Sequence, residues 1–208
     1  MKIMQKINKD KFELGTIELG TEVYATDPCY SIGTWCQVLV QGLKPGKYHC
    51  FMYKAYVNDW NGKSRVVTDL WIAHEDNIKA YPKKLLNDYG VGVDTGVAGF
   101  FDKDYYEFHQ IHETEEQDDE DEHVQEWRFN MFDQIYEYAL NGEKYIEPSW
   151  DVFTQKWVYP KVKQERLSGK CFDNKCVNCL SGFGDGSYSL YEAKNSKGQI
   201  VALRLKFI

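Results

Sequence analysis

The sequence predicts an α+β domain that is mainly β, a twisted antiparallel sandwich or open barrel with one long amphipathic helix. Three observations lead to this class. Short runs rich in aromatic and β-branched residues recur along the chain. Turn-forming residues separate these runs, and only residues 124–140 have a convincing helical periodicity. The 208 residues show no repeat, no Pro-rich linker and no second apolar core, so we expect a single domain over residues 1–208.

Strands account for most of the first half of the chain. Alternating or aromatic-rich runs predict strands at residues 12–19, 37–41, 48–57, 65–74 and 90–102. Residues 43–47 have the pattern of a type II turn, and the Asn-Gly pair within residues 58–63 favours a hairpin. Residues 76–88 have room for one short helical turn, interrupted by Pro82. The four glycines of residues 90–102 indicate bulges or close backbone approach.

The second half contains the predicted helix and two further hairpins. Apolar residues fall near one face of residues 124–140, and Asn141-Gly142 follows as a stop signal. Residues 150–160 predict a strand or an irregular aromatic segment. The remaining strands flank two turns, at residues 173–175 and 194–198.

One acidic run sets the charge of the chain. Residues 113–122 contain eight acidic residues and no Lys or Arg, and removing eight negative charges from the net charge of −7 leaves +1. We expect a flexible acidic loop at about residues 113–123, or alternatively a surface for a basic protein partner. The near-neutral remainder argues against a groove for long nucleic acids. No apolar run of membrane-spanning length or signal-peptide type occurs, so we expect no membrane partner and a cytoplasmic location.

The six cysteines are expected to be free thiols. An intracellular chain keeps its thiols reduced, and a turn at residues 173–175 places Cys171 and Cys176 on two arms of a hairpin. Cys176 and Cys179 are three residues apart on a strand and therefore point to opposite faces. Zinc binding by this Cys-x-x-Cys unit and redox pairing stay open as alternatives. We assign no metal site, and the sequence identifies no cofactor.

Three segments combine Asp with Gly or Pro, at residues 27–30, 92–102 and 181–188. Such junctions gather at strand ends, so we expect their side chains to converge on one side of the sheet. Glycines let the backbone approach a partner closely, and aromatic side chains beside them can stack on a ligand. The predicted ligand-binding residues are Asp27, Cys29, Tyr30, Asp94, Thr95, Asp102, Phe183, Asp185, Ser187 and Tyr188.

The same three segments, with the ending at residues 198–207, resemble an uncharacterised domain-of-unknown-function family of bacteria and their phages. Members of that family carry a DPCY segment, a VDSGQAG-like segment and a GYGDGSY-like segment in this order. The resemblance spans most of the chain. This sequence departs from the pattern at Thr95 and Val97 and in its acidic insertion. The resemblance implies a grouping and no established activity.

Our leading hypothesis is a module that binds or sequesters a small polar molecule, with a nucleotide as one candidate and phage–host defence as the setting. The first alternative is a hydrolase whose clustered carboxylates act with or without a divalent metal, or whose nucleophile is Cys29 beside a histidine. The second alternative is a protein-interaction or inhibitor module that acts through the acidic loop.

Overall fold

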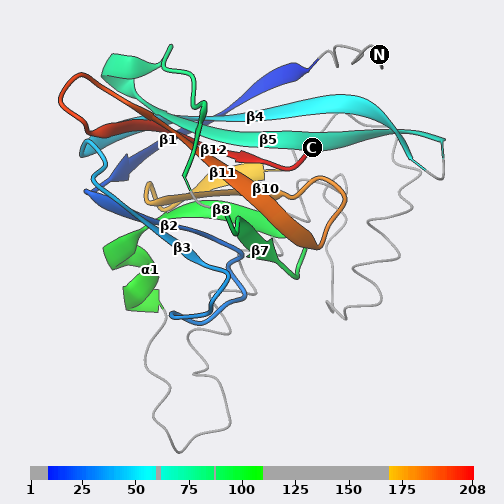
Figure 1. The fold of residues 1–208 in the computed structure, drawn as a ribbon, viewed down its shortest axis with the longest axis horizontal. Helices are drawn as coiled ribbons and strands as arrows, with labels where there is room; N and C mark the ends of the chain where they lie inside the picture. Colours follow the sequence, from blue (N-terminus) through cyan, green and yellow to red (C-terminus); the bar gives the residue numbers. More distant parts are fainter. Residues whose placement is uncertain (1–8, 60–61, 87, 110–168) are drawn as a thin grey trace, which may run out of the picture.

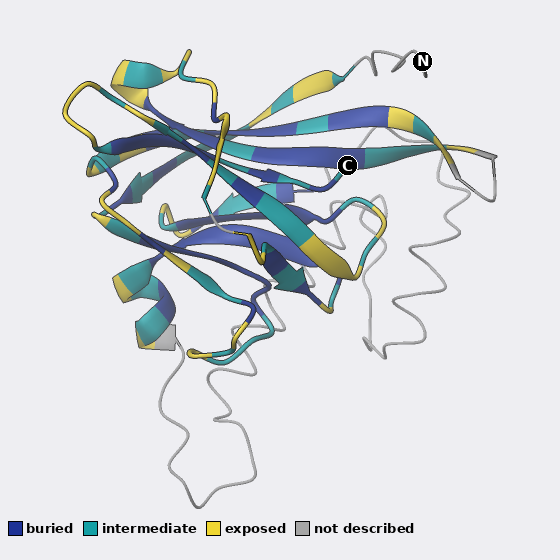
Figure 2. Cartoon of the chain, viewed as in Figure 1, coloured by how far each residue is buried: buried dark blue, intermediate teal, exposed yellow. Residues whose placement is uncertain are grey.

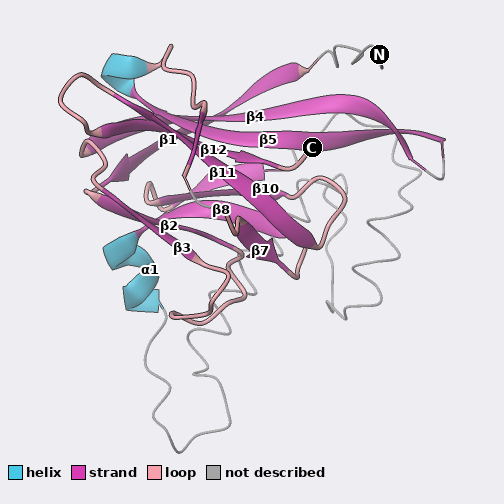
Figure 3. Ribbon diagram, in the orientation of Figure 1, coloured by secondary structure: helices cyan, strands magenta, loops and turns pink. Residues whose placement is uncertain are grey.

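The structure, a computed structural model, describes residues 9–59, 62–86, 88–109 and 169–208. Its twelve strands form two antiparallel sheets, which confirms the prediction of a mainly β domain (Figures 1 and 3). The sheets pack on each other as an open sandwich. None of the helices in these segments has the length and apolar character needed to cross a membrane.

The larger sheet has seven strands. Six of them lie in the order β1 (Asp10–Leu19), β4 (Gly46–Asp59), β5 (Gly62–His74), β12 (Ile200–Lys206), β11 (Gly186–Lys194) and β6 (Lys84–Leu85). The seventh, β7 (Val91–Val93), pairs with the start of β11. Both predicted hairpins in this sheet, β4–β5 and β11–β12, are confirmed by their antiparallel registers.

The smaller sheet has five strands. Their order is β3 (Val38–Gln41), β2 (Glu22–Thr26), β8 (Val97–Asp102), β10 (Cys176–Leu180) and β9 (Gly169–Phe172). The predicted β9–β10 hairpin is confirmed. Its turn residues Asp173 and Asn174 both have positive φ, 47° and 57°, as a type I′ turn requires.

Two connections differ from the sequence-based prediction, because the chain changes sheets there. Residues 90–102 form two strands, and the turn at residues 94–96 carries the chain from β7 in the larger sheet to β8 in the smaller one. The turn predicted at residues 43–47 is not formed: Leu43 makes an isolated bridge to Ile200, and Gly46 already begins β4, which belongs to a different sheet from β3. A local turn pattern does not reveal which sheet the next strand joins.

The described segments contain two short helices, α1 (Lys103–His109) and the 3₁₀ helix η1 (Glu75–Asn77). The short helical turn that we predicted within residues 76–88 therefore begins one residue earlier. The predicted amphipathic helix at residues 124–140, the acidic loop at 113–123 and the segment 150–160 lie outside the described residues. The seven residues of α1 are not that long helix.

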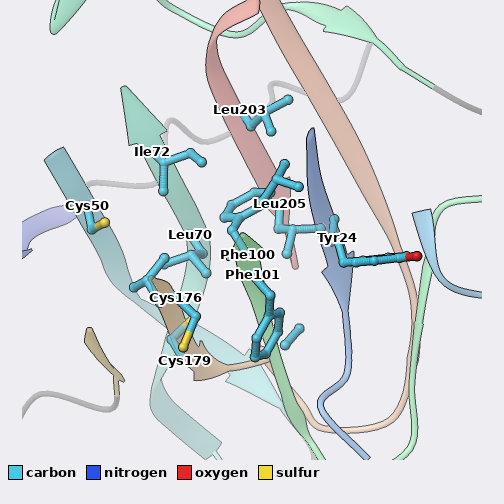
Figure 4. Close-up of a cluster of buried hydrophobic side chains, with 14 of the residues drawn as sticks. Tyr24, Cys50, Leu70, Ile72, Phe100, Phe101, Cys176, Cys179, Leu203 and Leu205 are labelled. Carbon is cyan, nitrogen blue, oxygen red and sulfur yellow. The ribbon is translucent and has the colours of Figure 1, made fainter. Parts of the chain in front are cut away.

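The core lies between the two sheets. In the larger sheet, register aligns Met52, Leu70, Leu205 and Leu190 as one row across four strands, and all four are fully buried. Phe100 of β8 faces this row from the smaller sheet (Figure 4). Figure 2 shows that buried residues run through the centres of both sheets.

Helix α1 covers the other face of the smaller sheet. Tyr106 is fully buried, with its ring centroid 5.2 Å from that of Tyr24 and 4.9 Å from that of Phe101. Both faces of the central strands are therefore covered. This explains why Cys176 and Cys179, on opposite faces of β10, are both fully buried.

A buried lysine predicts a pH-dependent stability. Lys54 of β4 is only 8% exposed, and burial, helped by the nearby Arg65, lowers its pKa to about 8. The unfolded chain has the usual Lys pKa of about 10.4, so the protonated side chain disfavours folding by up to about 3 kcal/mol below pH 8. This penalty disappears as the pH rises from about 8 to about 10.4.

We expect urea unfolding to show this effect as a difference between the wild-type protein and Lys54→Met. The free energy of unfolding of Lys54→Met should exceed that of the wild type most at pH 7, and this difference should shrink by pH 10. Comparing the two proteins at each pH cancels the titration of Tyr and Cys side chains. If the free energy of unfolding of the two proteins changed with pH in parallel, the lowered pKa of Lys54 would be incorrect.

Candidate functional site

Three loops meet at one end of the sandwich, and we call them the junction loops. They are residues 27–37 after β2, residues 94–96 between β7 and β8, and residues 181–185 between β10 and β11 (Figure 1). They meet because β2, β8 and β10 are antiparallel neighbours. The end of β2, the start of β8 and the end of β10 therefore lie at the same end of the smaller sheet.

The Asp27 carboxylate ties the first two junction loops together. It is completely buried, and its Oδ2 accepts hydrogen bonds from the backbone N–H groups of Asp94 at 2.9 Å and Thr95 at 2.8 Å. Its Oδ1 accepts from the N–H of Cys29 at 2.9 Å, and the Thr95 hydroxyl lies 2.8 Å from Oδ2. Burial raises the pKa of Asp27, while the hydrogen bonds from Cys29 and Thr95 act in the opposite direction. Asp27 therefore supports the loops and has little capacity left for a ligand.

Tyr30 joins the first junction loop to the second, and Cys36 joins it to β7. Its hydroxyl is hydrogen-bonded to the side chains of Cys36 and Asp94, and its pKa is raised, first by burial and then by these two partners. The carbonyl of Cys36 accepts from the N–H of Gly92 at 3.0 Å. A Cβ on Gly92 would lie 2.6 Å from the Cβ of Cys36, so only glycine allows the two backbones to come this close.

The third junction loop is held by hydrogen bonds within itself, to the second junction loop and to Tyr188. The Ser181 hydroxyl donates to the carbonyl of Gly184 at 2.7 Å, and the Ser181 N–H donates to the carbonyl of Gly96 at 3.0 Å. The Tyr188 hydroxyl lies 2.8 Å from the carbonyl oxygen of Ser181 and 2.6 Å from that of Gly184. Tyr188 also packs edge-to-face on Phe207. Its hydroxyl is therefore used within the fold.

Two carboxylates at this end of the domain are exposed, those of Asp94 and Asp185. The pKa of Asp185 is raised, first by burial and then by the negative charges of Asp94 and Asp27. The three junction loops contain no Lys, Arg or His. Within the described part of the chain, neither exposed carboxylate has an ion-pair partner. The junction loops therefore present negative charge to the solvent.

Three large aromatic side chains in or next to these loops are exposed. Trp35 is 87% exposed, Tyr89 85% and Phe183 51%. Trp35 precedes Cys36, and the carbonyl of Tyr89 accepts a hydrogen bond from the Ser187 hydroxyl at 2.7 Å. Phe183 was among the predicted ligand-binding residues, whereas Trp35 and Tyr89 were missed. A large aromatic residue inside a turn-rich segment was the available signal.

The structure brings most of the predicted residues together but separates Asp102. Asp102 lies at the far end of β8, five residues and about 16 Å of strand from Val97. It accepts hydrogen bonds from the N–H of Gly20 at 2.8 Å and that of Tyr105 at 3.4 Å, and so caps α1. The sequence looks the same whether an Asp precedes or follows a glycine-rich strand, so it did not show at which end of β8 the Asp102 side chain would be used.

The cysteines and histidines whose side chains the structure describes give no support for metal or nucleophilic chemistry. The six cysteines are free, and the described residues contain no group of three or more His, Cys, Asp or Glu arranged to hold a metal ion. His49 contacts Glu13, and His74 contacts the carbonyl of Pro45, both in or beside the larger sheet. Neither of these two histidines activates Cys29, whose thiol is hydrogen-bonded to Asp27.

Comparison with known families gives one match. A family model described as "Protein of unknown function (DUF4241)" matches residues 20–205, a range that includes all three junction loops. Searches of curated proteins and of solved structures found no match.

Proposed function

The chain belongs to the DUF4241 family of proteins of unknown function, as its resemblance to an uncharacterised family predicted, and we propose that it binds a small organic cation at the junction loops. The family description gives no activity, so the proposal rests on the site of this chain. This makes it a small-molecule binding module. A sequestering role and a setting in phage–host defence stay predictions.

One observation carries the proposal. The loops that hold the two exposed carboxylates, Asp94 and Asp185, also hold or adjoin three exposed aromatic side chains, those of Trp35, Tyr89 and Phe183. Aromatic faces attract ammonium groups through their quadrupole, and carboxylates attract them through charge. Tyr, Trp and Phe are also enriched at binding interfaces relative to the rest of a protein surface.

The same charges argue against a nucleotide as the ligand. A phosphate group would approach Asp94 and Asp185 with no basic residue in the junction loops to neutralise it. The N–H groups of Ser181 and Gly184 already donate to the carbonyls of Gly96 and Ser181. These two N–H groups are therefore not available to an anion.

A hydrolase is the second candidate, favoured by one observation. Burial and the Asp94 charge raise the pKa of Asp185, as is common for a general acid. Such an enzyme would turn over a cationic substrate instead of only binding it. Incubating the ligand with the protein and looking for a product by mass spectrometry separates the two functions.

Calorimetric titration of the full chain tests the proposal. We expect choline, agmatine or spermidine to bind and ATP not to bind. Trp35→Ala and Asp185→Asn should each weaken binding roughly tenfold, because each removes one element of cation recognition. The affinity should also decrease with added salt, since the carboxylates are exposed.

Two controls make this experiment specific. Tyr56→Ala removes an aromatic side chain that is 54% exposed on β4, outside the junction loops, and should not change the affinity. Deleting residues 113–122 removes the acidic run but none of the junction residues, so the affinity should again be unchanged. Loss of binding in the deletion alone would favour the interaction module instead. Binding of ATP in preference to the amines would overturn the cation proposal.

A further inference from the structure

Cys50 faces the smaller sheet from the inner side of β4. In the ladder it pairs with Ile72, and both side chains are fully buried in the core (Figure 4). On the other side Cys50 pairs with Gly15 of β1, at a point where the register of β1 shifts. The neighbour of Cys50 on this side therefore has no side chain to cover its thiol.

Cys171 faces the larger sheet from the edge strand β9. It pairs with Val177, which pairs with Phe100, and these two side chains are in the core between the sheets. A Cβ placed on Gly15 would lie 3.5 Å from the Cys171 Sγ, so this thiol occupies the space beside Gly15. The Cys50 and Cys171 side chains are hydrogen-bonded to each other across the two sheets.

A backbone hydrogen bond joins the two sheets near the place where these thiols meet. The N–H of Glu18 donates to the carbonyl of Asn174 at 2.8 Å, which ties β1 to the β9–β10 turn. The contact between the two thiols is therefore built into the packing of the two sheets.

Cys171 has no second thiol partner on its own hairpin. Cys176 pairs with Phe172, one position away from Cys171, and so points to the opposite face of the smaller sheet. There it is hydrogen-bonded to the Phe172 carbonyl and to Tyr105 of α1. Cys171 is half-buried, whereas Cys50 is fully buried. An oxidant from solvent therefore reaches Cys171 first.

We propose that Cys50 and Cys171 are an oxidisable thiol pair that forms a disulfide between the two sheets when the protein meets hydrogen peroxide. The Cys171 thiolate attacks one peroxide oxygen, the O–O bond breaks, hydroxide leaves and Cys171 becomes a sulfenic acid. The Cys50 sulfur then attacks the Cys171 sulfur, the S–O bond breaks and a second hydroxide leaves. With the two thiol protons, the products are one disulfide and two waters, so two sulfur atoms are oxidised and one peroxide is reduced.

The buried partner sets the rate of this reaction. Burial, and then the hydrogen bond with Cys171, raises the pKa of Cys50 well above its usual value. The Cys50 thiolate is therefore scarce at neutral pH, and the second step is the slower one. The disulfide should form faster as the pH rises above neutrality.

Peroxide treatment of the full chain, followed by non-reducing peptide mass spectrometry, tests the proposal. We expect the number of free thiols to fall by two, a Cys50–Cys171 linked peptide, and reversal by dithiothreitol. The oxidised protein should melt several degrees higher, because the new bond restricts the unfolded chain. Cys171→Ser, a change at a half-buried position, should abolish the linked peptide and the rise in melting temperature.

Two control variants identify the partner. Cys29→Ser removes the other half-buried cysteine, and Cys176→Ser removes the other cysteine of the hairpin. Both should still form the Cys50–Cys171 bond. A Cys171–Cys176 peptide, or a sulfinic acid at Cys171 with Cys50 still reduced, would overturn the proposal.

Discussion

Replacing Gly99 with alanine should lower the free energy of unfolding by about 3 kcal/mol or more. Gly99 lies in β8, between Thr26 of β2 and Asn178 of β10. A Cβ at this position would lie 2.0 Å from the Asn178 Oδ1 and 2.3 Å from the backbone oxygen of Val177. The side chain can move, but the backbone oxygen belongs to the central ladder and cannot move without breaking it.

Urea unfolding measures this loss, and Gly20→Ala is the matched control. A Cβ on Gly20 would meet only the Asp102 Oδ2, at an ordinary 3.5 Å. That variant should retain most of the wild-type stability. If Gly99→Ala were as stable as Gly20→Ala, the close pairing of β8 with β10 would be incorrect.

Asp27→Asn should lower the free energy of unfolding by about 2–3 kcal/mol. The buried carboxylate accepts hydrogen bonds from three backbone N–H groups and from the Thr95 hydroxyl. An amide has one oxygen, so its NH₂ group would face N–H groups that also donate. At least one buried donor would then lose its partner.

The matched control is Asp185→Asn. Asp185 is exposed, so this variant should change stability by no more than about 0.5 kcal/mol. Hydrogen exchange adds a local measurement, because the N–H groups of Asp94 and Thr95 should exchange faster in Asp27→Asn. Unchanged exchange there would show that Asp27 does not hold the turn at residues 94–96.

Asp27→Asn and Asp185→Asn should affect cation binding in different ways. Asp27→Asn should weaken cation binding only through the loss of stability and loop order. Asp185→Asn should weaken binding while the melting temperature stays near that of the wild type. This pair of variants therefore distinguishes a supporting carboxylate from a ligand-binding one.

Local patterns were enough to predict most strands and hairpins. The β4–β5, β9–β10 and β11–β12 hairpins all follow from turn residues placed between β-forming runs. These patterns depend on contacts within a few residues, which the sequence displays directly. The grouping with an uncharacterised family followed in the same way from three short segments.

The candidate site was only partly predictable. Asp27, Asp94 and Asp185 stood out because each lies within two residues of Gly or Pro near a predicted strand end. The structure shows that Asp27 is used internally, and that Asp102, with a similar sequence context, caps α1 at the far end of β8. Trp35 and Tyr89 were missed because exposure depends on what the rest of the chain covers.

The sequence alone predicted the β-rich class, the positions of the hairpins and the family. The folded domain was needed to show which sheet each strand joins, how the three junction loops meet, and that Cys50 lies against Cys171. The difference comes from the range of the interactions. Turn geometry and side-chain alternation act between neighbours in the chain, whereas sheet order and burial depend on pairings between residues far apart, such as Thr95 with Asp27.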